Sequence, residues 1–400
     1  MANPPRILFA SYLGYFDTSS GAALATRDLL ELLAKNGWSC GVVCGPELDC
    51  APAVDRAAAM ARLGLSVTDG TDGTDGGHRL FHTVAGGVRC TVFEPADWTG
   101  PREATVAEGE AFLRVFRTVA GRFQPDIVLT YGGRPPGMRL MALAKQMGFK
   151  VVFALHNFGY PGPQAFRDVD TVFVPSRFAQ AEYARRGVTA AVLPGPIPWD
   201  RVRAPRVEGK YVTFVNPVPP KGVFVAARIM AELGRRRPDI PFLVVESRGG
   251  VDWLGRAGVD LAGVTTVHRM VNTGQPAAFY GVSRAVLMPS LWWESLGRVA
   301  VESLVNGIPV IASDRGALPG TLGAAGVCLS VPDRYKPESR RAPAAAEVKP
   351  WCDEIERLWD DAAYFHERRR ASLAEAERWR PESLLSSYET FFQRLAAVSS

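Results

Sequence analysis

The chain has 400 residues, of which 47% are hydrophobic and 22% are charged, and its formal net charge is +5 at pH 7. This composition is typical of a globular protein, and the length suits two domains of roughly 200 residues each. The modest positive charge is compatible with phosphorylated ligands. Because no basic run and no basic stripe interleaved with aromatic residues is present, the sequence gives no indication of nucleic-acid binding.

The lengths of the hydrophobic runs and the spacing of the cysteines indicate the cellular compartment in which we expect the protein. No apolar stretch approaches the roughly 20 residues that a membrane-spanning helix needs, and no signal-peptide pattern is visible at the start. The six cysteines have no CxxC spacing and no neighbouring histidines, so we interpret them as reduced core residues rather than metal ligands or disulfides. We therefore expect a cytoplasmic protein without a transmembrane segment or a bound metal.

The first half of the chain alternates predicted strands with predicted helices. Strand Arg6–Ala10, a loop rich in glycine and serine, helix Ala22–Lys35 and strand Ser39–Val43 form a Rossmann-like opening. This opening lacks the GxGxxG fingerprint of dinucleotide sites. Further strands are predicted over Asp126–Thr130, Lys150–Leu155, Asp170–Val174 and Ala191–Leu193, with helices over Gly137–Met147 and Ala179–Arg186.

An amphipathic helix is predicted over Thr105–Phe123. It has two interpretations: packing against the sheet, or lying on a membrane surface through its basic residues Arg114, Arg117 and Arg122. Because these basic residues are few, we favour packing. Peripheral membrane contact stays open as the less favoured alternative.

A proline-rich segment, 194–200, is a natural linker between two domains. The second half again alternates strands and helices and then ends in long helical patterns. Strands are predicted over Tyr211–Val215, Pro241–Glu246 and Val264–His268, and helices over Val223–Leu233, Pro350–Ala374 and Pro381–Ala397.

One strand–loop–helix–strand unit carries the most informative residues. The apolar run Ala285–Met288 predicts a buried strand, and Ser295 is placed to cap a helix from about Gly297 to Asn306. Gly307 then occupies the C′ position, and Ile308–Ala312 is the next strand. The loop before the helix therefore lies beyond the carboxyl ends of the strands, where open α/β sheets bind ligands.

This unit holds two carboxylates, Glu294 before the helix and Glu302 inside it. Between them, the free amides of residues 295–298 form the positive end of a helix dipole, which favours phosphate. A diphosphate on those amides would have a hydroxyl-rich group at each end, one near each carboxylate. The alternative is that both glutamates only complement the dipole.

The wider pattern resembles a known family. Glu294 and Glu302 with seven residues between them after an apolar strand, then GIPVIASD (307–314) and GALPG (316–320), resemble the family-4 retaining glycosyltransferases of the GT-B fold, also called glycosyl transferases group 1. The resemblance implies an α/β protein with two Rossmann-like domains facing a central cleft. It implies an N-terminal acceptor domain, 1–198, to which the C-terminal helix, 381–400, crosses back, and a donor domain, 199–380.

The resemblance also implies roles for individual residues. Glu294 would contact the donor sugar, Glu302 would hold the ribose hydroxyls and Lys221 would bind the diphosphate. His156, at the end of a predicted strand, would contact the sugar, while Ser20 and Gly21 would face donor phosphate or acceptor. The remaining expected donor contacts are Ser295, Leu296, Gly297, Arg298, Asn216, Arg269 and Val271.

Two positions depart from the family pattern. Asn216 stands where the family has an arginine, which removes one charge from the diphosphate clamp. Gly320 stands where a glutamate is common.

The expected function is retaining transfer of a sugar from a nucleoside diphosphate sugar to an acceptor hydroxyl. UDP is favoured over GDP as the nucleotide of the donor, and the acceptor is an unidentified glycan, lipid or natural product. No metal or other cofactor is expected.

Two kinds of alternative remain. Within enzymes, the fold also suits an epimerase or a phosphorylase, although no Schiff-base signature for a pyridoxal cofactor is present. Outside enzymes, the alternative is a non-catalytic GT-B protein that binds a nucleotide sugar or a glycan. Asn216 and Gly320 favour this alternative, whereas intact Glu294, Glu302 and Lys221 argue against it.

Overall fold

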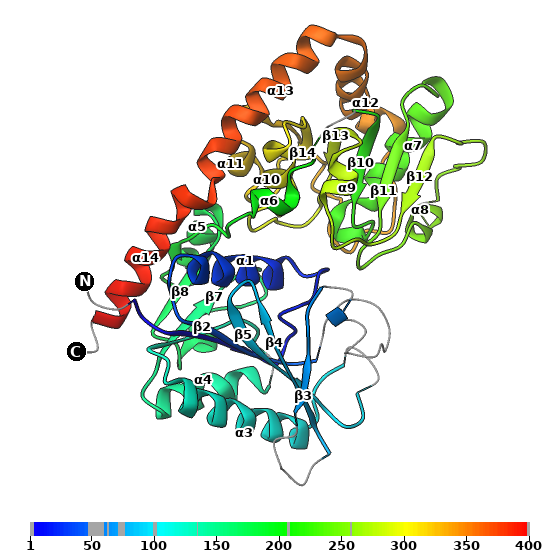
Figure 1. Cartoon of the computed structure of the whole chain (residues 1–400). Helices are drawn as coiled ribbons and strands as arrows, with labels where there is room; N and C mark the ends of the chain where they lie inside the picture. The colour runs from blue at the N-terminus through cyan, green and yellow to red at the C-terminus, as the bar shows by residue number, and fades with distance from the viewer. Residues whose placement is uncertain are drawn as a thin grey trace. The chain divides into compact units, whose positions relative to one another are not determined.

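The structure is a computed structural model that describes residues 4–46, 60–61, 64–70, 77–98, 102–133, 135–205, 209–256 and 258–397. The chain forms two compact units (Figure 1). The N-terminal unit comprises Met1–Pro196 together with Pro381–Ser400, and the C-terminal unit comprises Ile197–Arg380. Each unit is built on a mainly parallel β-sheet covered by helices, so the predicted α/β fold class with two parallel-sheet domains is confirmed.

The sheet of the N-terminal unit has nine strands within the described residues, in the order β3-β4-β5-β2-β1-β6-β7-β8-β9. All neighbours pair in parallel except β3 with β4 and β4 with β5. The strands are β1 (Ile7–Ser11), β2 (Cys40–Cys44), β3 (Thr68–Gly70), β4 (Arg79–Ala85), β5 (Val88–Glu94), β6 (Ile127–Thr130), β7 (Lys150–Ala154), β8 (Thr171–Val174) and β9 (Ala191–Val192).

The β4–β5 hairpin has no counterpart in the strands expected from sequence. Ala85 pairs with Val88 across a two-residue turn, in which Gly86 and Gly87 have φ angles of 55° and 83°. Positive φ at both central positions is what a tight hairpin turn requires, and glycine adopts it without strain. The Gly-Gly pair between two apolar segments is therefore the local sequence signal of this hairpin.

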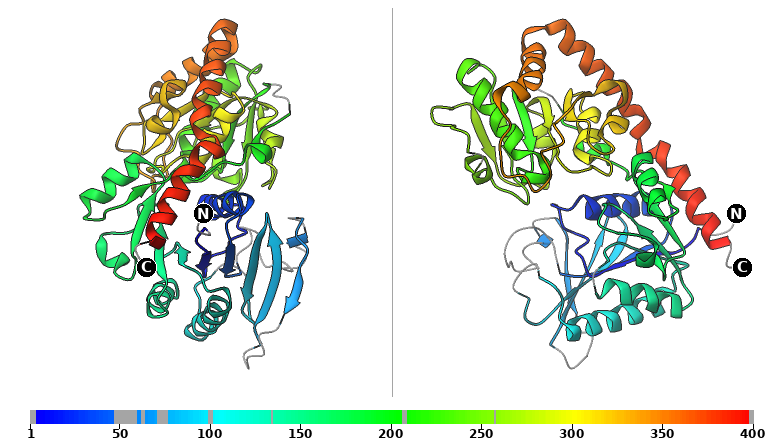
Figure 2. Two further views of the ribbon diagram at one scale, coloured as in Figure 1. Left: turned by 60° about the vertical axis from the view of Figure 1, so that its left-hand side comes forward. Right: turned by 180° about the vertical axis from the view of Figure 1, so that it is seen from behind.

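Helices cover both faces of this sheet (Figures 1 and 2). The core on one face joins α1 (Gly21–Lys35) and α14 (Pro381–Ala397) to the strands, and α14 contributes the buried Tyr388 and Phe392. The prediction that the C-terminal helix belongs to the N-terminal domain is thus confirmed. The other face is covered by α3 (Val106–Phe123), α4 (Gly137–Gln146) and α5 (Arg177–Arg185).

Helix α3 packs on the sheet through its apolar side, as the favoured interpretation predicted. Phe112 and Phe116 are fully buried, and the same core includes Leu113 and Val115. Arg114 and Arg117 lie on the exposed side of the helix. In the part of the chain that the structure describes, no helix combines the length and the apolar character needed to cross a membrane.

The sheet of the C-terminal unit is fully parallel, in the order β12-β11-β10-β13-β14-β15. Numbered within the unit, this is the order 3-2-1-4-5-6 of doubly wound dinucleotide-binding folds, in which the direction of strand addition reverses between the first and fourth strands. The reversal lies between β10 and β13. The strands are β10 (Tyr211–Val215), β11 (Phe242–Val245), β12 (Val267–Met270), β13 (Ser283–Met288), β14 (Val310–Ser313) and β15 (Val327–Leu329).

Alternate residues of these strands supply two cores. Val212, Phe242 and Leu287 pack in the first core, whereas Leu243 and Val286 pack in the second. The first core also includes side chains from helices α7 (Val223–Arg236), α8 (Asp252–Gly255) and α12 (Ala345–Asp360). The second core also includes side chains from helices α6 (Trp199–Val202), α9 (Ala277–Tyr280), α10 (Arg298–Val305) and α11 (Leu318–Leu322). Helix α13 (Ala362–Ala376) contributes to both cores.

The prediction of a single long helix over Pro350–Ala374 was wrong. It is divided into α12 and α13 at Asp361, whose backbone is extended and whose side chain accepts a hydrogen bond from the Tyr364 amide. Aspartate is a favoured N-cap, so a new helix begins there.

Among the cysteines, Cys50 lies outside the described residues, and the other five are free. Of these five, Cys40, Cys44, Cys90 and Cys352 are buried and Cys328 is half-buried.

Candidate functional site

The candidate site lies in the C-terminal unit at the point where the strand order reverses. The loop after β10 carries Lys221, and the loop after the adjacent strand β13 carries Glu294. The Lys221 Nζ lies 2.6 Å from the Glu294 Oε1, although the two residues are 73 positions apart. The Ser290 hydroxyl donates to the same Oε1 at 2.7 Å. Glu294 is only 5% exposed, so these partners compensate its loss of water.

Two glycines allow the loops around this pair to approach closely. Gly222 has φ 78°, and a Cβ at this position would lie 1.9 Å from the Pro289 carbonyl oxygen. Gly316 has φ 67°, and a Cβ there would lie 2.5 Å from the amide nitrogen of Glu294. The Leu291 amide also donates to the Pro220 carbonyl at 2.9 Å, which joins the two loops directly. The backbone therefore fixes the Lys221–Glu294 pair.

The second carboxylate, Glu302, lies on α10 in a buried polar cluster. Its Oε2 accepts a hydrogen bond from the Tyr280 hydroxyl of α9 at 2.8 Å, and its Oε1 is 2.9 Å from the Arg298 Nε. Burial, followed by the charge of Glu302, raises the pKa of Tyr280 well above its usual value, so this hydroxyl stays protonated and donates. Glu302 itself is 6% exposed.

The predicted Ser295 cap of α10 was wrong. The helix begins at Arg298, its N-cap is Gly297 at φ 85°, and no side chain caps its first amides. Leu296, just before the N-cap, has a buried side chain, and its backbone carbonyl accepts a hydrogen bond from the Thr321 hydroxyl. These two contacts turn the chain at this point. Helix α7 begins similarly: its N-cap is Gly222, again without a side-chain cap. Two helix N-termini without side-chain caps therefore follow β10 and β13, and the dipole of each favours an anion.

Asn216 orders the loops of the site and adds no charge. Its φ is 63°, a left-handed conformation that asparagine tolerates better than most residues. Its side-chain oxygen accepts from the Gly249 amide at 3.3 Å, and its carbonyl accepts from the Val218 amide at 2.8 Å. Asn216 therefore connects the end of β10 to the loop after β11.

The expected nucleobase contacts lie at the edge of the sheet. Arg269 is in β12, which β11 and β10 separate from β13, and it forms an ion pair with Glu246 at 2.8 Å. Val271 follows β12 and is 60% exposed. Both residues share the carboxyl edge of the sheet with Lys221 and Glu294, but neither joins the buried clusters around the two carboxylates.

The remaining predicted residues belong to the N-terminal unit. Ser20 is the N-cap of α1, because its hydroxyl accepts from the Ala23 amide, and Gly21 is the first residue of that helix. A Cβ at Gly21 would meet no atom within 4 Å, so local packing does not require glycine. His156 follows β7, and its ring lies 5.9 Å from the Tyr131 ring, edge to face.

His156 is expected to make stability depend on pH. Its residue surface is partly exposed, but its Nε2 is buried, and burial lowers the pKa of the imidazole to about 4. Because the unfolded imidazole titrates near pH 6.5, the folded state is favoured above pH 6.5 and loses stability as the pH falls toward 4.

Urea unfolding at pH 7.0 and pH 4.5 tests this prediction. Compared with H156F, which keeps an aromatic ring beside Tyr131, the wild type should lose about 2–3 kcal/mol more stability between these pH values. An identical pH dependence in the two proteins would show that His156 is protonated equally easily in the folded and unfolded states.

Sequence reasoning missed three residues of the site. Ser290 is only four positions before Glu294, so a local signal existed. Tyr280 reaches Glu302 only through tertiary packing of α9 on α10. Trp292, 41% exposed, has its ring 5.1 Å from the Lys221 Nζ, a cation–π contact across the two loops. Within the described residues, no three side chains of metal-ligand type converge.

Comparisons with known proteins converge on one family. Residues 199–338, which include both carboxylates and Lys221, match the family model described as glycosyl transferases group 1. The chain is 32% identical over 165 residues to a D-inositol 3-phosphate glycosyltransferase of Arthrobacter sp. (strain FB24), covering 39% of this chain and 36% of the relative. It is 28% identical over 286 residues to a GDP-mannose-dependent alpha-(1-6)-phosphatidylinositol monomannoside mannosyltransferase of Mycolicibacterium smegmatis, covering 58% and 74%.

Solved structures resemble the chain over almost its whole length. A glycosyltransferase of Rickettsia africae ESF-5 has 12% sequence identity and a TM-score of 0.67, with 98% of this chain and 99% of that chain covered. Anabaena Alr3699/HepE in complex with UDP and glucose has 15% identity and a TM-score of 0.67, with 97% and 99% covered. The chain therefore has the GT-B fold, and its residues 199–338 match the glycosyl transferases group 1 family.

Proposed function

We propose that the protein is a retaining glycosyltransferase that moves a sugar from a nucleoside diphosphate sugar to an acceptor hydroxyl. One observation carries the proposal: Lys221 and two helix N-termini without side-chain caps adjoin two buried carboxylates where the strand order reverses. A cation with two sets of backbone amides suits a diphosphate, and carboxylates suit sugar hydroxyls. The neighbouring structure with UDP and glucose supports this assignment.

Each group has a role in this proposal. The diphosphate binds Lys221 and the first amides of α7 and α10, which stabilise the negative charge that develops as the leaving group departs. Glu302 accepts hydrogen bonds from the ribose hydroxyls, and Glu294 accepts from the donor sugar. Attack on the same face of the sugar, assisted by the leaving diphosphate, needs no separate protein base, so positioning and electrostatics supply the catalysis. Placing the charge stabilisation on Lys221 and the amides makes the proposed reaction metal-independent.

The proposed donor is a UDP-sugar. Support comes from the neighbouring structures with UDP, while the mannosyltransferase relative, described as GDP-mannose-dependent, makes GDP the main competitor. His156, Ser20 and Gly21 are proposed to contact the donor sugar, the phosphate or the acceptor. Arg269 and Val271 are proposed near the base.

A non-catalytic nucleotide-sugar or glycan-binding protein is the second candidate. Asn216 favours it, because this residue provides no charge for the diphosphate and its side-chain oxygen already accepts a hydrogen bond from the Gly249 amide. The transferase and a nucleotide-sugar-binding protein both predict nucleotide binding, whereas only the transferase releases nucleoside diphosphate from its donor. Release of UDP or GDP from the nucleotide sugar in the presence of an acceptor library separates them.

Nucleotide binding is the first test. Thermal shift with UDP, GDP, ADP and TDP, each with and without magnesium, should show one preferred nucleotide without metal. A ligand at a hundredfold excess over its Kd stabilises the protein by about 2.7 kcal/mol, which is easily detected. K221M should lower affinity for the preferred diphosphate about tenfold or more and leave affinity for its nucleoside unchanged, because a charge-assisted contact is lost only at the diphosphate.

A matched substitution checks that the effect is local. Lys349, on α12, is an exposed lysine that pairs with Asp353, so K349M removes the same charge from the same unit. It should leave nucleotide affinity unchanged. If no nucleotide binds, or if K221M and K349M behave alike, the proposed diphosphate site is wrong.

A further inference from the structure

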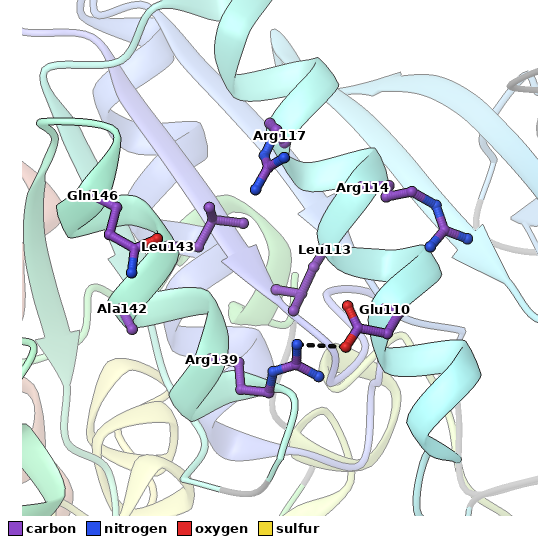
Figure 3. Close-up of a pocket in the computed structure, with 8 residues that line it drawn as sticks. All are labelled: Glu110, Leu113, Arg114, Arg117, Arg139, Ala142, Leu143 and Gln146. Atoms are coloured by element: carbon purple, nitrogen blue, oxygen red, sulfur yellow. Dashed lines mark ion pairs between the residues drawn. The ribbon is translucent and has the colours of Figure 1, made fainter.

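A basic groove separates helices α3 and α4 in the N-terminal unit (Figure 3). It has a volume of about 430 Å³. Leu113 and Leu143 project between the two helices, with Arg117 above them and Arg139 below them in this view. The groove is lined by Glu110, Leu113, Arg114, Arg117, Arg139, Ala142, Leu143 and Gln146.

The groove has an excess of positive charge. Three arginines and one glutamate line it, and Glu110 is 2.5 Å from Arg139. Within the described residues, Arg114 and Arg117 form no ion pair or hydrogen bond. Arginine guanidinium groups bind phosphate oxygens through two parallel hydrogen bonds, which makes them the preferred phosphate ligands in proteins. The excess charge therefore favours an anion with several oxygens.

The floor of the groove is apolar. Leu113 is 7% exposed and Leu143 is 9% exposed, and both belong to the core beneath the two helices. Ligand pockets typically have volumes of about 300–1,000 Å³, far more than a bare ion fills. A ligand that matches both the floor and the rim has a phosphate group and a carbon body.

The helix dipole does not account for the arginine positions. Favourable interaction of a cation with the dipole is confined to the last turn, which in α3 contains Arg122. Arg114 and Arg117 lie one to two turns earlier and three residues apart, a spacing that puts them on the same side of the helix. Their positions are therefore not explained by the helix dipole.

We propose that this groove is a binding site for the phosphate group of a small phosphate ester. Arg117, Arg139 and the Gln146 amide bind the phosphate, Arg114 adds charge at the rim, and Leu113 and Leu143 contact the carbon body. Glu110 competes with the ligand for Arg139. None of the residues that line the groove is assigned to the candidate nucleotide-sugar site, so the proposal does not depend on the function of that site.

Calorimetric titration of the full chain with glycerol 3-phosphate tests the proposal. R117Q should weaken binding about tenfold or more, because a charge-assisted contact is lost. E110Q should strengthen binding about threefold, because Arg139 is released from an exposed ion pair. R122Q removes a neighbouring exposed charge that does not line the groove and should have no effect.

Two further measurements separate this site from other sources of binding. The titration is repeated in the K221M protein, where binding at the groove should persist even if the candidate nucleotide site is impaired. Sedimentation with phosphatidylglycerol vesicles, compared with phosphatidylcholine vesicles, tests whether the phosphate belongs to a lipid headgroup. Binding of vesicles that depends on Arg117 but not Arg122 supports the site with a lipid as its ligand.

Three outcomes would overturn the proposal. The first is absence of binding to both glycerol 3-phosphate and anionic vesicles. The second is equal weakening by R117Q and R122Q, which would indicate general charge attraction. The third is weaker binding in E110Q, which would mean that the Glu110–Arg139 pair supports the ligand rather than competing with it.

Discussion

Replacing Glu302 with glutamine is expected to lower both nucleotide affinity and stability. The substitution removes the carboxylate proposed for the ribose hydroxyls, so the affinity for the preferred nucleotide should fall about tenfold or more, whereas affinity for inorganic pyrophosphate should be unchanged. It also removes the negative charge that lies 2.9 Å from the Arg298 Nε, in a site where the Glu302 side chain is 8% exposed. Breaking a buried pair costs about 3–5 kcal/mol of unfolding free energy.

A double variant separates the two effects. In E302Q/R298L both charges of the pair are removed, so urea unfolding should show that most of the lost stability returns. Nucleotide affinity should stay low, because the ribose contact is still missing. Y280F keeps the carboxylate and removes one of its donors, and should bind nucleotide. Recovery of nucleotide affinity in the double variant would mean that Glu302 has only a structural role.

Replacing Gly222 with alanine is expected to disrupt the site from its backbone. The new Cβ would lie 1.9 Å from the Pro289 carbonyl oxygen, a backbone atom, and the residue has φ 78°. Both loops must move apart, which displaces Lys221 from Glu294. We expect a loss of about 3 kcal/mol or more in unfolding free energy, from the clash and the strained conformation together, and nucleotide affinity reduced at least as much as in K221M.

G320A provides the matched control. Gly320 lies in α11 of the same unit, and a Cβ there would meet no atom within 4 Å. Alanine at an exposed helical position should leave stability unchanged or raise it by up to about 1 kcal/mol. Chemical denaturation and nucleotide titration measure both variants. Wild-type stability and affinity in G222A would contradict the close approach of the two loops.

The positions of the two carboxylates show how much of the site the sequence predicted. The strand–loop–helix–strand order around Glu294 and Glu302 was predicted correctly, and Gly307 indeed has a positive φ just after α10. These features depend on residues close together in the chain, because hydrophobic periodicity and helix termination are local. The N-cap was wrong because the conformation at Gly297 depends on a distant neighbour: a Cβ there would lie 2.6 Å from the Leu318 side chain.

By itself, the sequence determined the alternation of strands and helices and the family motif, and the resemblance carried by that motif implied that α14 belongs with the N-terminal domain. Only the tertiary structure decided which of these groups meet. The Lys221–Glu294 pair exists because β10 and β13 are neighbours in the sheet, and Tyr280 reaches Glu302 because α9 packs beside α10. Strand order and helix packing depend on contacts between residues far apart in the chain, and local periodicity carries no information about them.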